Sequence, residues 1–285
     1  MEYDIAIIGS GPAGMEAAIT AKIRNKNIIF LSSNNSSEKV GKAHLFENYL
    51  GLPNISGDDL NEAFLEHLKS LDIEIIPAKV TNIYDMGDYF NIQAETEIYA
   101  AKSVILATGV NFGRPYENED KFLGRGVSYC ATCDGNLYKN KSIAVIGASP
   151  KEEKEANYLA ELASSIIYIP LYKDVINLSS KIEVVREIPT SIEGNIKVSK
   201  LKTDKSEYEV EGIFILRDAI SPKNLVPGLV TDEDRVVVDR NMATNIKGLF
   251  ACGDIVGRPY QAIKAAGEGN IAALSAVEFI DESKK

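Results

Sequence analysis

Two cysteines separated by two residues, in Cys130-Ala131-Thr132-Cys133, are the residues of this chain whose type and spacing best suit chemistry. Thiols at this spacing can close a small, easily reduced disulfide ring, and such cysteines can have a depressed pKa. Asp134 follows directly, where its carboxyl group could hand a proton to a leaving thiolate. The pattern indicates redox chemistry at Cys130 and Cys133, with Asp134 as a candidate acid.

The same pair is compatible with two other interpretations, half of a zinc site and two inert buried thiols. Structural zinc takes four ligands, and besides the pair the chain offers only Cys252, His44 and His67, with no second pair at metal spacing. We therefore expect no metal site. Inert thiols are disfavoured by the neighbouring Asp134 and Gly135. Cys252 ends an apolar strand, where a free cysteine behaves as a small buried hydrophobe, so we assign it no chemistry.

A glycine-rich turn, Gly9-x-Gly11-x-x-Gly14, follows a predicted strand and opens a predicted helix. In this context Gly9 permits a tight turn, Gly11 lets the backbone approach a pyrophosphate, and Gly14 lets helix and strand pack closely. The helix N-terminus adds N–H groups and partial positive charge. The turn indicates dinucleotide binding, and a glycine turn without a ligand is the alternative. Residues 32–34 read Ser-Ser-Asn where an acid is usual, so a hydroxyl, an amide or the backbone must hold the ribose.

This strand–turn–helix–strand pattern occurs twice, with starts about 140 residues apart, which predicts two nucleotide-binding-type domains. The predicted elements are strands 3–8, 28–31 and 102–106 with helix 15–24, then strands 142–146 and 165–169 with helix 151–162. The chain ends in a strand over 248–252 and an alanine-rich helix over 262–280. Because this last helix has no sheet of its own, we expect it to pack on the first domain. The first domain would then span 1–112 and 243–285, and the inserted domain 113–242, with linkers at 110–115 and 240–245.

The overall composition is that of an ordinary globular protein of 285 residues, 45% hydrophobic and 25% charged, with a formal net charge of −10. This excludes a disordered chain and a coiled coil. The acidic balance argues against nucleic acid, whose binders carry a basic stripe, and against docking on anionic lipid. No apolar run of about 18 residues predicts a membrane span, and the N-terminus is acidic where a signal peptide would be basic. We therefore expect a cytoplasmic protein that binds neither nucleic acid nor membrane.

Five short motifs together resemble the low-molecular-weight thioredoxin reductase family, and the match covers nearly the whole chain. They are Gly-Ser-Gly-Pro-Ala-Gly at 9–14, Ala-Thr-Gly at 107–109, Cys-Ala-Thr-Cys-Asp-Gly at 130–135, Phe-Ala-Cys-Gly-Asp at 250–254 and Tyr-Gln-Ala at 260–262. The resemblance implies an α/β fold of two Rossmann-like three-layer nucleotide-binding domains, the second inserted in the first. It also implies FAD as the cofactor, bound by the first domain, and a homodimer that rotates its domains between turnovers.

The resemblance also implies roles for individual residues. Cys133 would face the flavin, Cys130 would attack the disulfide of thioredoxin, and Asp134 would be the acid. The cofactor-binding residues would be Gly9, Gly11, Pro12 and Ala13 at the pyrophosphate, Asn48, Val80, Thr108, Gly109 and Asp254 along the rest of the cofactor, and Gln261 and Ala262 at the pyrimidine end of the flavin. From the residues alone, Asp254 fits a turn-capping carboxylate equally well.

The chain departs from the family where the inserted domain normally binds NADPH. The usual Gly-x-Gly-x-x-Ala is replaced by Gly-Ala-Ser-Pro-Lys-Glu at 147–152. Pro150 lacks a donor N–H, and Glu152 places negative charge where a phosphate should lie. The arginine-rich run that grips the 2′-phosphate in the family is replaced by Tyr-Ile-Pro-Leu-Tyr-Lys at 168–173, in which only Lys173 is basic. We therefore expect loss of NADPH use.

With NADPH excluded, the sequence resembles the ferredoxin-dependent flavin thioredoxin reductases of anaerobic bacteria, which have this remodelled central domain. The resemblance implies an enzyme that passes electrons from reduced ferredoxin through FAD to a Cys130–Cys133 disulfide and on to thioredoxin. The alternatives are an NADPH-dependent thioredoxin reductase and a flavin-binding redox sensor. Two further replacements lie near the expected flavin ring, at residues 40–44 and at Tyr260, whose ring could stack on the flavin. Since ferredoxins are usually acidic, such a donor requires a local basic patch on this acidic chain.

Overall fold

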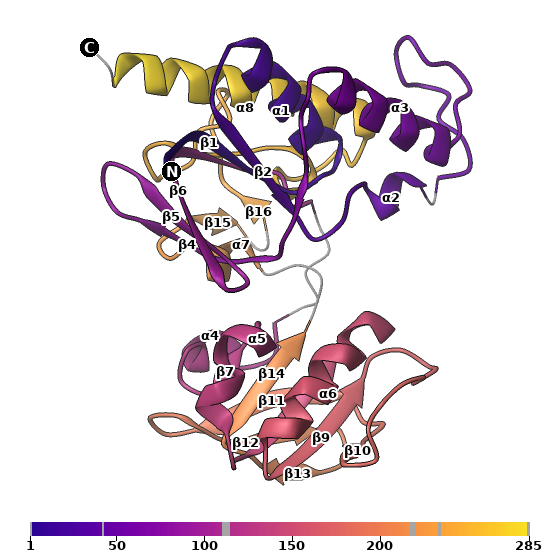
Figure 1. Cartoon of the computed structure of the whole chain (residues 1–285), viewed down its shortest axis with the longest axis vertical. Helices are drawn as coiled ribbons and strands as arrows, with labels where there is room; N and C mark the ends of the chain where they lie inside the picture. The colour runs from indigo at the N-terminus through magenta and orange to yellow at the C-terminus, as the bar shows by residue number, and fades with distance from the viewer. Residues whose placement is uncertain (1, 42, 110–114, 217–220, 233–234, 284–285) are drawn as a thin grey trace. The chain divides into compact units, whose positions relative to one another are not determined.

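The computed structural model describes residues 2–41, 43–109, 115–216, 221–232 and 235–283, with the backbone alone for Glu2 and Cys133. The chain divides into two compact units, Met1–Val110 together with Ser221–Lys285, and Asn111–Ile220 (Figure 1). The first unit is built from both ends of the chain, and the second unit is inserted between them.

A parallel sheet forms the centre of the first unit. β1 (Glu2–Ile8) pairs with β2 (Ile28–Ser32) on one side and with β6 (Glu97–Leu106) on the other, β2 pairs with β3 (Ile76–Pro77), and β17 (Leu249–Ala251) pairs with the end of β6. Residues 5–8 of β1 are buried one after another, as expected for a parallel strand that is covered on both faces. Because these strands run parallel, their carboxyl ends share one edge of the sheet.

An antiparallel pair extends this sheet. β5 (Phe90–Ala94) pairs with the first part of β6, and β4 (Val80–Asp85) pairs with β5. The N–H of Ala78 donates to the carbonyl of Ser32, which brings the start of β4 close to the carboxyl end of β2.

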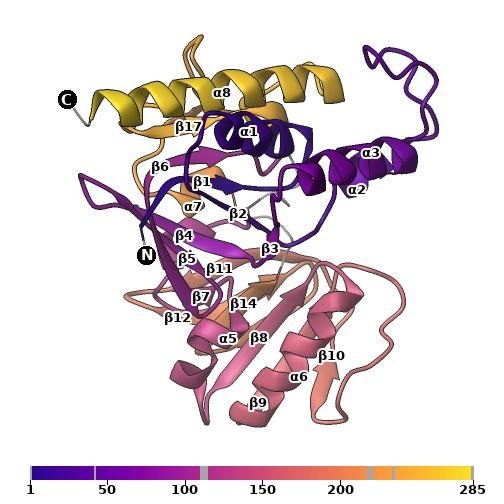
Figure 2. The same cartoon turned by 45° about the horizontal axis from the view of Figure 1, so that its top comes forward.

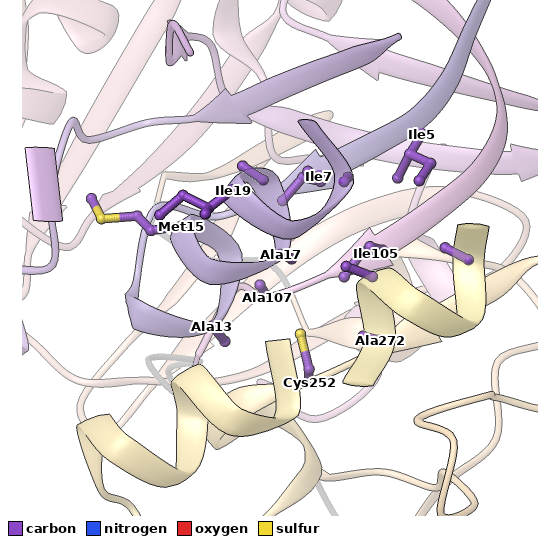
Figure 3. Packing of buried hydrophobic residues seen from close by; sticks show 14 of the residues in the cluster. Ile5, Ile7, Ala13, Met15, Ala17, Ile19, Ile105, Ala107, Cys252 and Ala272 are labelled. Atoms are coloured by element: carbon purple, nitrogen blue, oxygen red, sulfur yellow. The ribbon is translucent and has the colours of Figure 1, made fainter. Parts of the chain in front are cut away.

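Three longer helices cover the first unit: α1 (Pro12–Ile23), α3 (Gly57–Ser70) and α8 (Ala262–Glu282). The predicted final helix packs on the first unit as expected, and α1 and α8 lie side by side over one face of the sheet (Figure 2). Small residues allow this close approach: a methyl group added at Gly269 of α8 would lie 2.1 Å from the carbonyl oxygen of Ala13. Figure 3 shows the resulting core, in which Ala13 and Ala17 of α1 lie near Ala272 of α8.

The second crossing between the units differs from the expected one. The chain returns to the first unit at Ser221, and not at the expected residue 243. The reason is packing: α7 (Pro222–Leu225) contacts β4, and β16 (Arg235–Val236), which pairs with β15 (Thr231–Asp232), contacts the 3₁₀ helix η3 (Gly253–Val256). The expected linker at 240–245 lies within the first unit, where Ala243 forms a β-bridge with Phe250. The other expected linker includes residues 110–114, which lie outside the described residues.

The second unit has a parallel sheet of its own, in the order β10-β9-β8-β14-β7. These strands are β7 (Val127–Ser128), β8 (Ser142–Gly147), β9 (Ser165–Pro170), β10 (Ile182–Val184) and β14 (Gly212–Leu216). The helix α6 (Glu153–Leu162) covers this sheet through Ala156 and Leu159. A separate antiparallel sheet contains β11 (Pro189–Gly194), β12 (Val198–Thr203) and β13 (Glu207–Glu209).

Short helical turns complete the described chain. They are α2 (Glu38–Gly41) in the first unit and α4 (Glu119–Phe122), α5 (Ala131–Asp134), η1 (Gly135–Tyr138) and η2 (Pro150–Glu152) in the second. Within the described ranges, no helix combines the length and apolar character needed to cross a membrane.

Candidate cofactor site and redox centre

The glycine turn at the end of β1 needs glycine at two positions for reasons within the protein. Gly9 has a φ of 107°, and a Cβ there would lie 2.5 Å from the carbonyl oxygen of Ala107. A Cβ at Gly14 would lie 1.8 Å from the carbonyl oxygen of Gly9. Gly11 is different, because no protein atom lies within 4 Å of an added Cβ and its φ of −78° suits any residue. The space beside Gly11 is therefore open for a ligand.

The N-terminus of α1 faces this open space without a side-chain cap. Gly11 is the N-cap residue, and Pro12 is the first residue of the helix. Proline suits this position because its missing N–H has no partner in the first turn anyway. The uncapped N–H groups of the first turn and the helix dipole suit a phosphate.

A second part of the site lies at the carboxyl end of β6. The hydroxyl oxygen of Thr108 is buried and has no hydrogen-bond partner among the described residues. Gly109 follows with a φ of 70° and open space around an added Cβ. Buried hydroxyls are normally paired, so this unpaired group beside the glycine turn marks a place where a ligand atom fits.

The end of β2 and the loop after it carry Ser32, Ser33 and Asn34 where an acid usually holds the ribose. The Oγ atom of Ser32 accepts a hydrogen bond from the N–H of Ser10 at 3.2 Å and lies 2.9 Å from the Ser10 Oγ atom. The Ser10 hydroxyl in turn donates to the carbonyl of Asn34. These hydroxyls fix the loop against the glycine turn. Val80, the first residue of β4, lies two residues after Ala78, whose N–H donates to the carbonyl of Ser32 in β2.

Polar residues from distant parts of the chain meet near the start of α8. Asp254 in η3 forms an ion pair with Lys39, and Asn48 donates from Nδ2 to Oε1 of Gln261 at 3.3 Å. The Lys39 ammonium lies 4.7 Å from the ring centre of Tyr260, and the Arg258 guanidinium lies 5.6 Å from it. The expected stacking of Tyr260 on a flavin stays a prediction.

These groups together fit FAD. Gly9, Gly11, Pro12 and Ala13 would hold the pyrophosphate, and Thr108, Gly109 and Asp254 follow β6 and β17 at the same sheet edge. Ligands of open α/β sheets bind at this carboxyl edge. Asn48, Gln261 and Ala262 gather at the start of α8. The structure thus brings the predicted cofactor residues to one side of the first unit.

The predicted redox residues lie in the second unit. Cys130 is disulfide-bonded and only 8% exposed, while Cys252 is free. The only other cysteine of the sequence is Cys133, in α5. Cys252 is fully buried, and burial, followed by the charge of Glu268, raises the pKa of its thiol far above the ordinary value. Such a thiol does not form a nucleophilic thiolate, which agrees with the expectation of no chemistry at Cys252.

Ser128, which the sequence did not single out, connects Cys130 to Asp134. Its hydroxyl oxygen accepts the N–H of Cys130 at 3.1 Å and donates to Oδ2 of Asp134 at 2.7 Å. The Oγ atom of Thr132 lies 3.4 Å from the Cys130 sulfur. Ser128 therefore holds the candidate acid on the same turn as the disulfide.

The second glycine turn, at the end of β8, has its first glycine packed against a tyrosine. A Cβ at Gly147 would lie 1.9 Å from the hydroxyl oxygen of Tyr168. That hydroxyl lies 3.0 Å from the hydroxyl of Tyr172, which donates to Oε1 of Glu153 at 2.7 Å. The Glu153 carboxylate also accepts the N–H groups of Ile176 and Asn177. A partly buried Tyr–Tyr–Glu chain thus lies beside the first glycine of this turn.

Two buried glutamates lie at the start of α6, the helix that follows the second glycine turn. Glu152 and Glu153 are 7% and 3% exposed, and the helix is entered through the 3₁₀ turn η2 rather than directly. Burial raises the pKa of Glu153, but its hydrogen bonds from Tyr172, Ile176 and Asn177 outweigh this and bring the pKa below the ordinary value. Glu153 is therefore ionised at neutral pH and adds negative charge at the start of α6.

Residues 3–269 match the pyridine nucleotide-disulphide oxidoreductase family model. The chain is 33% identical to the thioredoxin reductase of Ureaplasma parvum, with 98% of this chain and 97% of that protein covered. The chain belongs to the thioredoxin reductases of this family. A solved ferredoxin-flavin thioredoxin reductase from Clostridium acetobutylicum is 52% identical, covers 100% of this chain and 99% of its own, and superposes with a TM-score of 0.92. A thioredoxin reductase from Gloeobacter violaceus is 29% identical with a TM-score of 0.80, over 100% and 96% of the two chains.

These comparisons confirm the resemblance and the α/β fold class with Rossmann-like parallel sheets. FAD is the cofactor of this thioredoxin reductase family, and the geometry of the first unit fits it. The roles assigned to individual site residues stay predictions. Among the described residues, no cluster of three or more His, Cys, Asp or Glu side chains is arranged to hold a metal ion.

Proposed function

We propose that this thioredoxin reductase takes its electrons from reduced ferredoxin and not from NADPH. The observation that carries the proposal is the altered turn of the second unit, where Tyr168 lies against Gly147 and an ionised glutamate, Glu153, begins α6. A dinucleotide pyrophosphate needs open space and free donors at such a turn. At the second turn a tyrosine ring lies against Gly147, Pro150 supplies no N–H, and Glu152 and Glu153 are buried at the start of α6.

The similarity to the clostridial protein supports the same proposal. That protein is described as a ferredoxin-flavin thioredoxin reductase and matches the whole of this chain at 52% identity. Relatives described simply as thioredoxin reductases match at lower identity, 33% and 30%. Ferredoxin as the donor, thioredoxin as the substrate, a homodimer and a cytoplasmic location all belong to this proposal.

The residues of the second unit perform the exchange with thioredoxin. FAD, when bound, supplies the coupling between a one-electron donor and a two-electron disulfide. Two electrons cleave the Cys130–Cys133 disulfide, and the Cys130 thiolate attacks one sulfur of the thioredoxin disulfide to form a mixed disulfide. Asp134 takes the proton that the Cys130 thiol loses and gives it to the thioredoxin thiolate that leaves. Cys133 then attacks Cys130, which releases reduced thioredoxin and restores the disulfide. Ser128 orients Asp134 for this transfer.

Anaerobic turnover with thioredoxin tests the donor. We expect reduction of thioredoxin with chemically reduced ferredoxin and no turnover with NADPH or NADH. Bleaching of the flavin absorbance by NADPH on the timescale of turnover would contradict the proposal and favour the NADPH-dependent alternative.

Cysteine variants test whether the protein is an enzyme at all. Cys130→Ser and Cys133→Ser should each abolish thioredoxin reduction while FAD stays bound, because each removes one sulfur of the exchange. Cys252→Ser is a matched control. The molecules of this variant that fold should reduce thioredoxin at the normal rate, because Cys252 takes no part in the exchange. Full activity in either Cys130→Ser or Cys133→Ser would instead favour a flavin-binding redox sensor.

A further inference from the structure

A cavity of about 330 Å³ lies in the second unit, away from the second glycine turn. Gly126, Lys141 and Glu211 line it, and each directly precedes a parallel strand, β7, β8 and β14 respectively. The cavity therefore lies at the amino edge of the sheet, whereas Gly147 lies at the carboxyl edge. It shares no residue with the predicted cofactor or redox residues.

The charge of this cavity is opposite to that of the whole chain. Arg125, Lys141 and Lys197 line it, with Glu211 as the single acid, in a chain whose formal net charge is −10. Across the described ranges, none of the three cations forms an ion pair with a carboxylate, although both lysines of the neighbouring β12 do so. Three unpaired cations around one hollow attract an anion.

The walls of the cavity are built from tightly connected backbone. The N–H of Val198 donates to the carbonyl of Arg125 at 2.9 Å, and the N–H of Ile213 donates to that of Gly126 at 2.7 Å. Gly126 has a φ of 119°, and a Cβ there would lie 2.5 Å from the Cβ atom of Val198. A ligand would thus meet a preformed site, which lowers the entropic cost of binding.

An aromatic residue, Tyr138, also lines this site. Tyr138 packs on Gly212 so closely that a Cβ there would lie 2.3 Å from the ring, and it meets Phe214 edge-on with ring centres 5.1 Å apart. The Lys141 ammonium lies 5.3 Å from the centre of the Tyr138 ring. Burial, and to a lesser extent the charge of Asp134, raises the pKa of the Tyr138 hydroxyl, so this group remains a hydrogen-bond donor at neutral pH.

We propose that this cavity binds a small phosphate-bearing molecule. Its volume lies at the lower end of the range for small-molecule sites, about 300–1,000 Å³, which suits a metabolite rather than a dinucleotide. The planar fork of Arg125 matches two phosphate oxygens, and the two lysines supply point charges.

The test uses the full-length, FAD-loaded protein, so that the glycine turn of the first unit is already occupied. Inorganic pyrophosphate is the probe, titrated calorimetrically at low ionic strength. We expect saturable binding that weakens about tenfold in Arg125→Gln, Lys141→Gln and Lys197→Gln, since each variant removes one charge-assisted hydrogen bond to the phosphate. Lys181→Gln, an exposed lysine of the same unit outside the cavity, is the control for net charge and should bind normally.

Three results would overturn the proposal. One is the absence of saturable binding in the unsubstituted protein, and another is equal weakening in Lys181→Gln. The third is a rise in KM for thioredoxin in the cavity variants with unchanged pyrophosphate binding, which would assign the cations to a protein partner. Circular dichroism and FAD content of each variant establish that it is folded.

Discussion

Gly11 and Gly14 belong to the same turn, but a methyl group added at each would meet different surroundings. At Gly14 it would strike the backbone of Gly9, whereas at Gly11 it would enter open space. The protein itself therefore does not require glycine at position 11, and a bound pyrophosphate would. This contrast separates the structural role of the motif from its binding role.

The contrast predicts two different outcomes of substitution by alanine. Gly11→Ala should leave the free energy of unfolding of the FAD-free protein unchanged and weaken FAD binding, measured by flavin fluorescence. Gly14→Ala should lower the free energy of unfolding by about 1–3 kcal/mol, because the added methyl group overpacks the turn. Normal FAD affinity in Gly11→Ala would show that the pyrophosphate lies elsewhere.

Glu153 gives a prediction about pH. Burial raises the pKa of Glu153, but hydrogen bonds from Tyr172, Ile176 and Asn177 lower it by more. The pKa in the folded chain therefore lies below the ordinary 4.5. Such a carboxylate stabilises the fold above its unfolded pKa, and this contribution is lost as the pH falls through the folded pKa. We expect Glu153→Gln to have a lower melting temperature than the unsubstituted protein at pH 7, with a gap that narrows at acidic pH.

The control for Glu153 lies on the same helix. Glu161 of α6 is exposed, so Glu161→Gln should change the melting temperature little at any pH. A gap between Glu153→Gln and the unsubstituted protein that stays constant down to acidic pH would mean that shape, and not charge, explains the effect.

Among the elements, α8 offers a matched pair of glycines two residues apart. Gly267 is exposed, with no atom within 4 Å of an added Cβ, whereas a Cβ at Gly269 would lie 2.1 Å from the carbonyl oxygen of Ala13. We expect Gly267→Ala to raise the free energy of unfolding by about 0.5–1 kcal/mol, since alanine favours helix. Gly269→Ala should lower it by about 1–3 kcal/mol, because it forces α8 away from α1. Denaturant unfolding of both variants measures the difference, and equal effects would contradict the close packing of α1 and α8.

The elements that the sequence predicted well are those with a strong local pattern. The apolar runs of β1, β2, β8 and β9 and the alanine-rich α8 lie within a few residues of their expected positions. The expected domain boundary at 243 was wrong because α7, β15 and β16 are too short to carry a periodic pattern, and only their contacts with β4 and η3 show which unit they join.

In the candidate site, too, local patterns could be predicted from the sequence and long-range contacts could not. The spacing of Gly9, Gly11 and Gly14 indicated a ligand turn directly, and the Lys39–Asp254 pair could not be foreseen because its members lie 215 positions apart. The sequence indicated that the second turn was altered through Pro150 and Glu152. It gave no sign that Tyr168 fills the space beside Gly147, since a contact across neighbouring strands depends on their register.

At the scale of the whole molecule, the net charge of −10 is a difficulty for an acidic electron donor. Charges separated by more than about 8 Å are largely screened at physiological salt, so a local group of cations can still attract such a donor. In the first unit, Lys39 and Arg258 flank the ring of Tyr260, next to Gln261 at the start of α8. Because Asp254 offsets Lys39, the exposed Arg258 supplies the net positive charge at this place.

Arg258 therefore tests the ferredoxin proposal at the surface. We expect Arg258→Gln to lower kcat/KM for reduced ferredoxin by about threefold or more and to weaken its dependence on salt, since charges at the rim of an interface act mainly on the association rate. FAD content should not change, nor should the rate at which chemically reduced enzyme reduces thioredoxin, because Arg258 takes no part in disulfide exchange. Arg240→Gln removes an equal charge from an exposed position of the same unit and should leave kcat/KM unaltered. Equal losses in the two variants would mean that the donor responds to the overall charge of the chain and not to the cations around Tyr260.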